Sequence, residues 1–266
     1  MIKRIGRPAI AICMAIALVA TLSSPAQAHY VYEKGEIYKS ADVCVDGRAE
    51  VSHGDGGGYA RADTWSETRG FVYGVGWVNC AVGWSRPAGY IAARYDYLVF
   101  DLSAGVWGLC RQLDWWYGSG SHLTVAWNFG NRTPCGTAWY ATIGWSAVRN
   151  GSTWNGGEIA SGNHWLDPPL TLTAQHSAQP PRPAWVRKNG TIDSAKFPDE
   201  LPVMSDDGRL RRDGTGAPVL TPISKVPPLV ADAEALQGSA EAERTVIVEN
   251  GVRTEIIEVA PTRPAT

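Results

Sequence analysis

Apolar and polar residues alternate with a period of two through the middle of the chain, which predicts β-strands. The stretches that alternate, or that are rich in aromatic and branched residues, are YARADTW (59–65), GYIAARYDYLVFD (89–101), VWGLCRQLDWWY (106–117), SHLTVAWNF (121–129) and AWYATIGWSAV (138–148). Glycine-rich turns such as HGDGGG, GSG and NGSTWNGG separate them, and no segment shows a capped, amphipathic helical period. The pattern predicts an all-β fold, an antiparallel β-sandwich or barrel.

The same alternation indicates a candidate ligand-binding face. If 106–117 and 121–129 form a hairpin through Gly118–Gly120, Trp116 lies across from His122, and Asp114 lies across from Thr124. An aromatic ring surrounded by hydrogen-bonding groups can stack against and orient a sugar. The alternative is that the Trp116 ring belongs to the core. The candidate binding residues are Gln112, Asp114, Trp116, His122, Thr124 and Asn128.

Residues 1–28 have the pattern of a signal peptide. Lys3, Arg4 and Arg7 precede an apolar run from Pro8 to Ala20, and Ala26-Gln27-Ala28 is a small-x-small cleavage site. The apolar run is short of the ~20 residues that a membrane-spanning helix needs, which argues against an uncleaved anchor. We therefore expect a secreted, extracellular protein that begins at His29 and has no membrane span.

Composition divides the remaining chain into parts. Eleven of the twelve tryptophans lie between Trp65 and Trp165, whereas thirteen of the seventeen prolines lie at or after Pro168. Aromatic residues supply a core, while proline and charge oppose one. We therefore predict a β domain over 29–166, followed by a largely disordered, Pro- and charge-rich linker over 167–244.

The last part of the chain again has the pattern of strands. RTVIVENGVRTEIIEVAP contains two alternating, branched runs around Asn250-Gly251, the strongest short-range signal of a hairpin. It predicts a β-hairpin over 245–260. Because a lone hairpin is marginal in water, it should dock on its own domain or add strands to the sheet of a protein partner.

Four cysteines remain after the signal peptide, and an even number in an exported chain predicts two disulfides. A metal site would need pairs such as CxxC, which the sequence lacks. Of the three pairings we favour Cys44–Cys80 and Cys110–Cys135, because each links neighbours along a series of hairpins.

The charge of the β domain is nearly balanced, with ten Lys and Arg against twelve Asp and Glu, which argues against nucleic acid as a partner. We find no glycosidase-like carboxylate pair, GxSxG, HExxH or P-loop, so we expect no enzyme and no cofactor. One alternative is a copper site on the amino terminus and ring of His29. It would need a second histidine from His53, His122 or His164, with Tyr30 or Tyr32 as the axial group.

WGLCRQLDWWYGS and TPCGTAWYATIGWSAVRNGSTWNGGEIASGNHWL, with the signal peptide before them, resemble a loose group of small, Trp- and Gly-rich secreted proteins of actinobacteria. The resemblance covers roughly Cys44 to Leu166 and implies a secreted β-rich domain, without an activity to carry over. The functional expectation is a non-catalytic binding protein for a glycan or a cell-envelope component. The alternative is an extracellular assembly protein that uses its C-terminal hairpin for strand addition.

Overall fold

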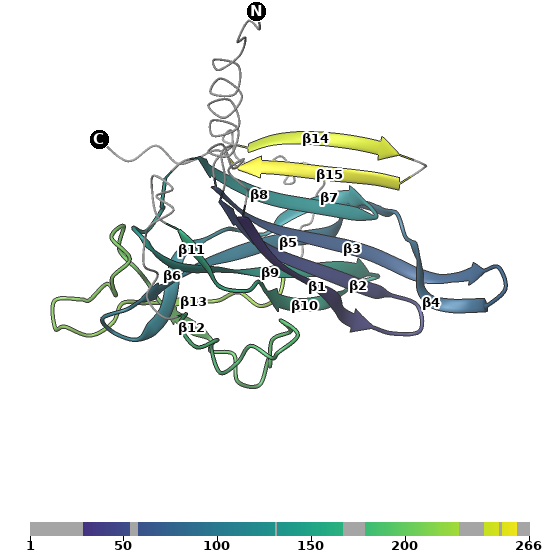
Figure 1. Cartoon of the computed structure of the whole chain (residues 1–266). Coiled ribbons are helices and arrows are strands. Elements are labelled where there is room, and N and C mark those ends of the chain that lie inside the picture. The colour runs from purple at the N-terminus through teal and green to yellow at the C-terminus, as the bar shows by residue number, and fades with distance from the viewer. Residues whose placement is uncertain are drawn as a thin grey trace, which may run out of the picture.

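The computed structural model describes residues 29–53, 58–130, 132–166, 179–228, 242–249 and 252–259. Within these ranges the chain forms strands and no helix (Figure 1). Two main sheets pack face to face, which confirms the predicted all-β, sandwich-like fold. In the same ranges there is accordingly no helix of the length and apolar character that crossing a membrane requires.

The first main sheet has seven strands. They are β1 (His29–Lys39), β2 (Cys44–His53), β3 (Gly58–Val72), β4 (Gly76–Gly83), β8 (His122–Gly130), β14 (Ala242–Glu249) and β15 (Val252–Val259). Their order is β1-β2-β3-β8-β15-β14, and β4 pairs with the far end of β3. All neighbours are antiparallel except β15, which is parallel to β8.

The second main sheet has six strands. They are β5 (Arg86–Asp101), β6 (Val106–Gln112), β7 (Trp116–Gly120), β9 (Ala138–Asn150), β10 (Thr153–Ala160) and β11 (His164–Leu166). β5 is central, because it pairs with β9 on one side and with β6 and β7 on the other. The short strands β12 (Glu200–Pro202) and β13 (Leu220–Pro222) form a separate pair.

The core lies between the two main sheets. Each strand contributes every second side chain to it, on the side that faces the other sheet. Tyr97 of β5 stacks on Tyr140 of β9 at 5.0 Å between ring centroids and meets Trp127 of β8 edge-on at 5.8 Å. Leu123 and Val125 of β8 are fully buried in the same layer. The other parity of β2, β3 and β8 therefore faces away from the core, and this outer face positions the candidate site.

The predicted hairpin between 106–117 and 121–129 is wrong. The first segment breaks into β6 and β7, which both pair with β5, whereas β8 belongs to the other sheet. The chain crosses between the sheets at Ser121, whose carbonyl accepts a hydrogen bond from the Ser66 amide at 2.9 Å. Gly120 takes the left-handed backbone (φ 90°) that this crossing uses. Local alternation was right about the strands but carried no information on which sheet each one joins.

Both predicted disulfides are present. Cys44–Cys80 joins the start of β2 to β4, and Cys110–Cys135 joins β6 to the connection before β9. Two disulfides indicate an oxidising compartment.

The predicted C-terminal hairpin is confirmed as β14 and β15, with Glu249 paired to Val252; Asn250 and Gly251 lie outside the described residues. The hairpin docks on its own domain along β8. Ile257 is fully buried in the core, and the buried Glu255 carboxylate accepts hydrogen bonds from the Ser119 amide (2.9 Å) and hydroxyl (3.1 Å). Strand pairing with β8, the buried Ile257 side chain and two hydrogen bonds to Glu255 thus fix the hairpin to the domain.

The expectation of a disordered linker over 167–244 is wrong for residues 179–228; the parts 167–178 and 229–241 lie outside the described residues. Residues 179–228 cover the outer face of the six-stranded sheet (Figure 1). Phe197 packs edge-on against Trp145 of β9 at 5.6 Å, and the Met204 amide donates to the Leu109 carbonyl at 2.9 Å. The chain therefore continues its packed structure past Leu166, because β5 and β9 carry apolar side chains on both faces and need a cover on each.

Candidate functional site

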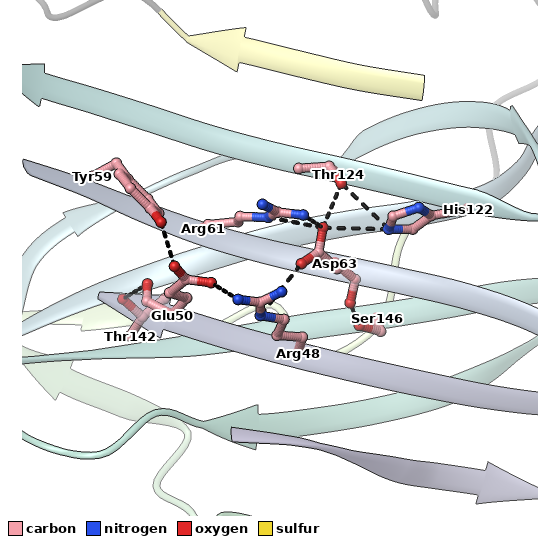
Figure 2. A network of polar contacts seen from close by, with 9 residues as sticks. All are labelled: Arg48, Glu50, Tyr59, Arg61, Asp63, His122, Thr124, Thr142 and Ser146. Atoms are coloured by element: carbon pink, nitrogen blue, oxygen red, sulfur yellow. Dashed lines mark hydrogen bonds and ion pairs between the residues drawn. The ribbon is translucent and has the colours of Figure 1, made fainter. Parts of the chain in front are cut away.

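The outer face of the seven-stranded sheet combines aromatic rings with a charged network, and we call it the aromatic–polar face. The strand register brings its residues together: Arg48 lies opposite Asp63, Glu50 opposite Arg61, and Tyr32 opposite Glu50. It consists of Tyr30, Tyr32, Lys34, Arg48, Glu50, Tyr59, Arg61, Asp63, Trp65, His122, Thr124 and Asn128. Figure 2 shows the polar part of the face, with Arg48 between the two carboxylates.

Glu50 is the first centre of the network. Its carboxylate accepts hydrogen bonds from the Arg48 guanidinium and the Tyr59 hydroxyl, and it is only 1% exposed. Burial raises the pKa of Tyr59, and the hydrogen bond to Glu50 raises it further. The Tyr59 hydroxyl therefore stays protonated as a donor, and a buried carboxylate requires such a partner.

Asp63 is the second centre, and it is fully buried. Its Oδ1 accepts hydrogen bonds from Arg61 Nε (3.0 Å), from Arg61 Nη2 (2.9 Å) and from the Thr124 hydroxyl; His122 Nε2 lies 3.4 Å from the same oxygen (Figure 2). Burial alone would raise the pKa of Asp63, but the contacts with His122 and Arg61 more than offset it and hold this pKa below its usual value. Asp63 is thus a charged anchor for three neighbouring side chains.

Aromatic rings frame the network on two sides. The Trp65 ring stacks on the His122 ring at 4.4 Å with an interplanar angle of 11°, and Lys34 Nζ lies 3.9 Å from the Trp65 centroid. On β1, the Tyr30 and Tyr32 rings stack at 5.6 Å and 19°, and the Arg48 guanidinium lies 4.5 Å from the Tyr32 centroid. These two tyrosines are 56% and 47% exposed, so their rings are open to a ligand.

This face offers groups for stacking and for hydrogen bonding. Glu50 and Asp63 are buried and already bonded to neighbouring donors, so neither carboxylate is presented to solvent. It presents flat rings, the outer edges of arginine guanidinium groups and a partly covered imidazole. Such a set can stack on the apolar side of a sugar ring and donate hydrogen bonds to its hydroxyl groups.

The structure separates the six predicted site residues. His122, Thr124 and Asn128 lie together on the outward side of β8, as their parity predicted. Gln112 ends β6 opposite Asp96 in the other sheet, and Asp114 is exposed in the connection to β7. Trp116 begins β7 and packs against the core between the sheets, which was the alternative considered from the sequence.

Sequence analysis missed most of the aromatic–polar face because it assigned no strands before residue 59. The signal was present in Tyr30-Val31-Tyr32 and in Arg48-Ala49-Glu50-Val51, where polar or aromatic residues alternate with apolar ones. In each run the apolar member points to the core. This alternation identifies two further strands and the side of each that faces away from the core.

A second candidate is a pocket of about 500 Å³ between the edges of the two sheets. It is lined by Glu36, Ile37, Gly156, Gly157, Glu158, Arg187, Thr191, Ile192, Asp193, Ser194 and Ala195. Its carboxylates have partners: Glu36 pairs with Lys39 at 2.9 Å, Asp193 with Arg187 at 3.6 Å, and Glu158 accepts from the Ser194 hydroxyl at 3.1 Å. Burial is the main reason that the pKa of Glu158 is raised. The pocket has no aromatic residue in its lining, so it suits a sugar less well than the open face.

The histidines considered for copper lie in different places. The backbone of His29 pairs with that of His53 across β1 and β2, whereas His122 belongs to the aromatic–polar face and His164 begins β11. Among the residues that the structure describes, no three His, Cys, Asp or Glu side chains are grouped so that they could hold a metal ion.

Comparisons of the chain with protein-family models, with curated proteins and with solved structures find no match.

Proposed function

We propose that the chain is an exported binding protein that recognises an extracellular or cell-envelope glycan through the aromatic–polar face. One observation carries the proposal: two stacked, half-exposed tyrosine rings lie beside a guanidinium group that is held in place by a buried carboxylate. A sugar has an apolar ring face and a polar edge, and this pairing of groups matches both. The signal-peptide pattern and the oxidised cysteines support export.

The network makes the face suitable for binding because its polar groups are fixed before a ligand arrives. Arg48 is held by Glu50, and Arg61 and His122 are held by Asp63. Groups that are already ordered lose little conformational entropy on binding, so more of the contact energy appears as affinity. An open sheet face also suits an extended polysaccharide chain better than a small ligand, which usually occupies a concave pocket.

The test compares Tyr32→Ala and Tyr30→Ala with the wild type in pull-down assays on insoluble cellulose, chitin and peptidoglycan, and on a glycan array. Each variant should lose about 1–3 kcal/mol of binding free energy, the range for stacking on an aromatic side chain, which is roughly a tenfold to hundredfold weaker affinity. Melting temperatures should be unchanged, because both rings lie at the surface. Tyr73→Ala is the matched control, since Tyr73 is an exposed tyrosine on the β3–β4 hairpin and outside the face. Unchanged binding by Tyr32→Ala, or no binding by the wild type, would contradict the proposal.

A second candidate function is assembly by strand addition, and β14 favours it. Among the described residues β14 pairs only with β15, so its other edge ends the sheet. Val246, Ile247 and Val248 on this strand are 42%, 40% and 65% exposed. A free, apolar edge strand is a template for another chain. Ile247→Lys should then abolish an association that light scattering detects in the wild type; a monomeric wild type at high concentration would exclude self-assembly through this edge.

A further inference from the structure

The far end of β3 and all of β4 form a hairpin that extends beyond the sandwich. β3 loses its pairing to β8 after Trp65 and to β2 after Glu67, and from Thr68 onward its only strand partner in the described part of the chain is β4. Figure 1 shows this hairpin projecting from one end of the molecule. We call residues 70–78 the apolar tip.

The apolar tip gathers five exposed large hydrophobic side chains, of which three are aromatic. Tyr73 is 96% exposed, Val75 73%, Trp77 64% and Phe71 61%. The sequence from Gly70 to Asn79 contains no charged residue. A contiguous exposed apolar group of this kind marks an interaction site more often than a scattered surface residue does.

The apolar side chains point to both sides of the hairpin. Phe71 pairs with Trp77, so both lie on one side, where their rings meet at 5.9 Å in an edge-on contact. Val72 lies on the other side opposite Gly76, and Tyr73 and Val75 are at the turn. A protein surface normally covers one side of such a ribbon, whereas an apolar phase that surrounds the tip covers both sides and the turn.

The backbone of the tip is folded and anchored. The Val75 amide donates to the Val72 carbonyl at 3.0 Å, and Gly74 (φ 82°) takes the left-handed turn position that favours glycine. At the base of the hairpin, the Cys44–Cys80 disulfide joins β4 to β2, and the Thr68 hydroxyl donates to the Asp42 carbonyl at 3.0 Å. The exposed side chains are therefore presented by a fixed base.

We propose that the apolar tip inserts into the interfacial region of a lipid bilayer and holds the protein at a membrane surface. Tyrosine and tryptophan favour the boundary between head groups and acyl chains. Arg69 is exposed at the base of the tip, with its guanidinium 5.6 Å from the Trp77 ring, where it can meet a lipid phosphate. No acidic residue lies between Gly70 and Asn79 to oppose that contact.

The length of the tip fits a shallow position. The three steps along the strand from Gly70 to Tyr73 extend for roughly 10 Å, the depth at which interfacial elements bury their apolar side. Deeper insertion is disfavoured, because the outer edges of a two-stranded hairpin carry backbone groups without strand partners, which the hydrocarbon core does not satisfy. The tip thus docks at the membrane surface without crossing it.

The test uses the secreted chain that begins at His29, with its N-terminus checked by mass spectrometry so that the apolar signal segment is absent. Wild type and Tyr73→Ser/Val75→Ser are sedimented with vesicles of phosphatidylcholine, with and without phosphatidylglycerol. The wild type should bind both kinds, more strongly when phosphatidylglycerol is present, and the double variant should bind at least about tenfold more weakly. Tyr32→Ala, on the aromatic–polar face, is the control and should sediment like the wild type. Each proposal uses a tyrosine of the other surface as its control. A failed vesicle test therefore leaves the glycan proposal intact, and a failed glycan test leaves the membrane proposal intact.

A second measurement locates the contact. Brominated lipids should quench the fluorescence of the wild type more than that of Trp77→Phe, because Trp77 is the tryptophan within the tip. The proposal is overturned if the wild type does not sediment with protein-free vesicles. That is the result expected if the tip binds a protein and not a lipid surface. Equal sedimentation of the wild type and the double variant would overturn it as well.

Discussion

Two surfaces of this molecule carry exposed aromatic rings, and they are built in opposite ways. On the aromatic–polar face, rings lie on cations that are themselves fixed by buried carboxylates, as Tyr32 lies beside Arg48 and Arg48 beside Glu50. At the apolar tip, the Phe71 and Trp77 rings meet edge-on, Tyr73 is 96% exposed, and the Arg69 guanidinium at the base lies 5.6 Å from the Trp77 ring. The first surface is therefore suited to a ligand with a polar edge. The second surface is suited to an apolar environment.

The energetic consequence is that the face is coupled to folding, whereas the tip is not. The polar side chains of the face are tied to the buried carboxylates of Glu50 and Asp63, so changes to them, unlike changes to the exposed tyrosine rings, should reach the stability of the whole domain. Side chains of the tip are exposed on a hairpin that is already paired, so their removal should change binding and leave stability almost unaffected.

The largest effect is expected from Asp63→Ala. This change leaves Arg61, His122 and Thr124 without their shared acceptor, and removing one partner of a buried ion pair costs about 3–5 kcal/mol. Urea unfolding should show this loss of stability, while Asp114→Ala, an exposed carboxylate, should stay within about 0.5 kcal/mol of the wild type. A small effect of Asp63→Ala would mean that the face is not coupled to the fold, and the contrast with the tip would be lost.

The pH dependence sharpens the same prediction. The pKa of Asp63 is lower in the folded state than its usual value, so its contribution to stability is complete above the unfolded pKa of about 3.9 and is lost as the pH falls through the folded value. The stability difference between the wild type and Asp63→Asn should narrow as the pH falls from about 5 to below about 4. A difference that widened in acid would contradict the assignment of Asp63 as a charged anchor.

How far the sequence predicts this fold depends on whether a property is local. Alternation located β5, β8 and β9, the Asn250-Gly251 turn located the C-terminal hairpin, and neighbouring cysteines were paired correctly. The sheet to which each strand belongs is not local. Gly118–Gly120 has the composition of a hairpin turn, but the chain there changes sheets, because β8 buries its apolar side against the opposite sheet.

The segment 179–228 shows a second limit of the sequence. Its prolines and charges argue against a core, but a few apolar residues, Phe197, Leu201 and Ile223, are enough to cover the outer face of the six-stranded sheet. Short polar turns replace long strands: Asp213 Oδ1 accepts from the amides of Thr215 (2.8 Å) and Ala217 (3.0 Å). The useful signal was in β5, where Leu98 and Phe100 lie on the side opposite Tyr97 and Val99, since a strand segment that is apolar on both sides needs a cover on each.

The candidate site was predictable only in part, for a related reason. Parity placed His122, Thr124 and Asn128 on one face, but their partners come from β2 and β3, far away in sequence. No spacing rule links Asp63 to His122; the register between β3 and β8 brings them together. The tip was overlooked because Phe71-Val72-Tyr73 has the composition of ordinary strand residues, and only its exposure distinguishes it.

The smallest expected effect on stability comes from removing the cation that lies beside an aromatic ring on each surface. Lys34 Nζ lies 3.9 Å from the Trp65 centroid, whereas the Arg69 guanidinium lies 5.6 Å from that of Trp77, near the limit of about 6 Å for a cation–π contact. Lys34→Met keeps the apolar stem and should lower the free energy of unfolding by about 0.5–1 kcal/mol, and Arg69→Met should lower it by less, as measured by urea unfolding at low salt. Lys34→Arg retains a cation over the ring and should recover most of the loss. Equal losses for Lys34→Met and Arg69→Met would show that charge supports the tip ring as strongly as the face, and the distinction between the two surfaces would then rest on exposure alone.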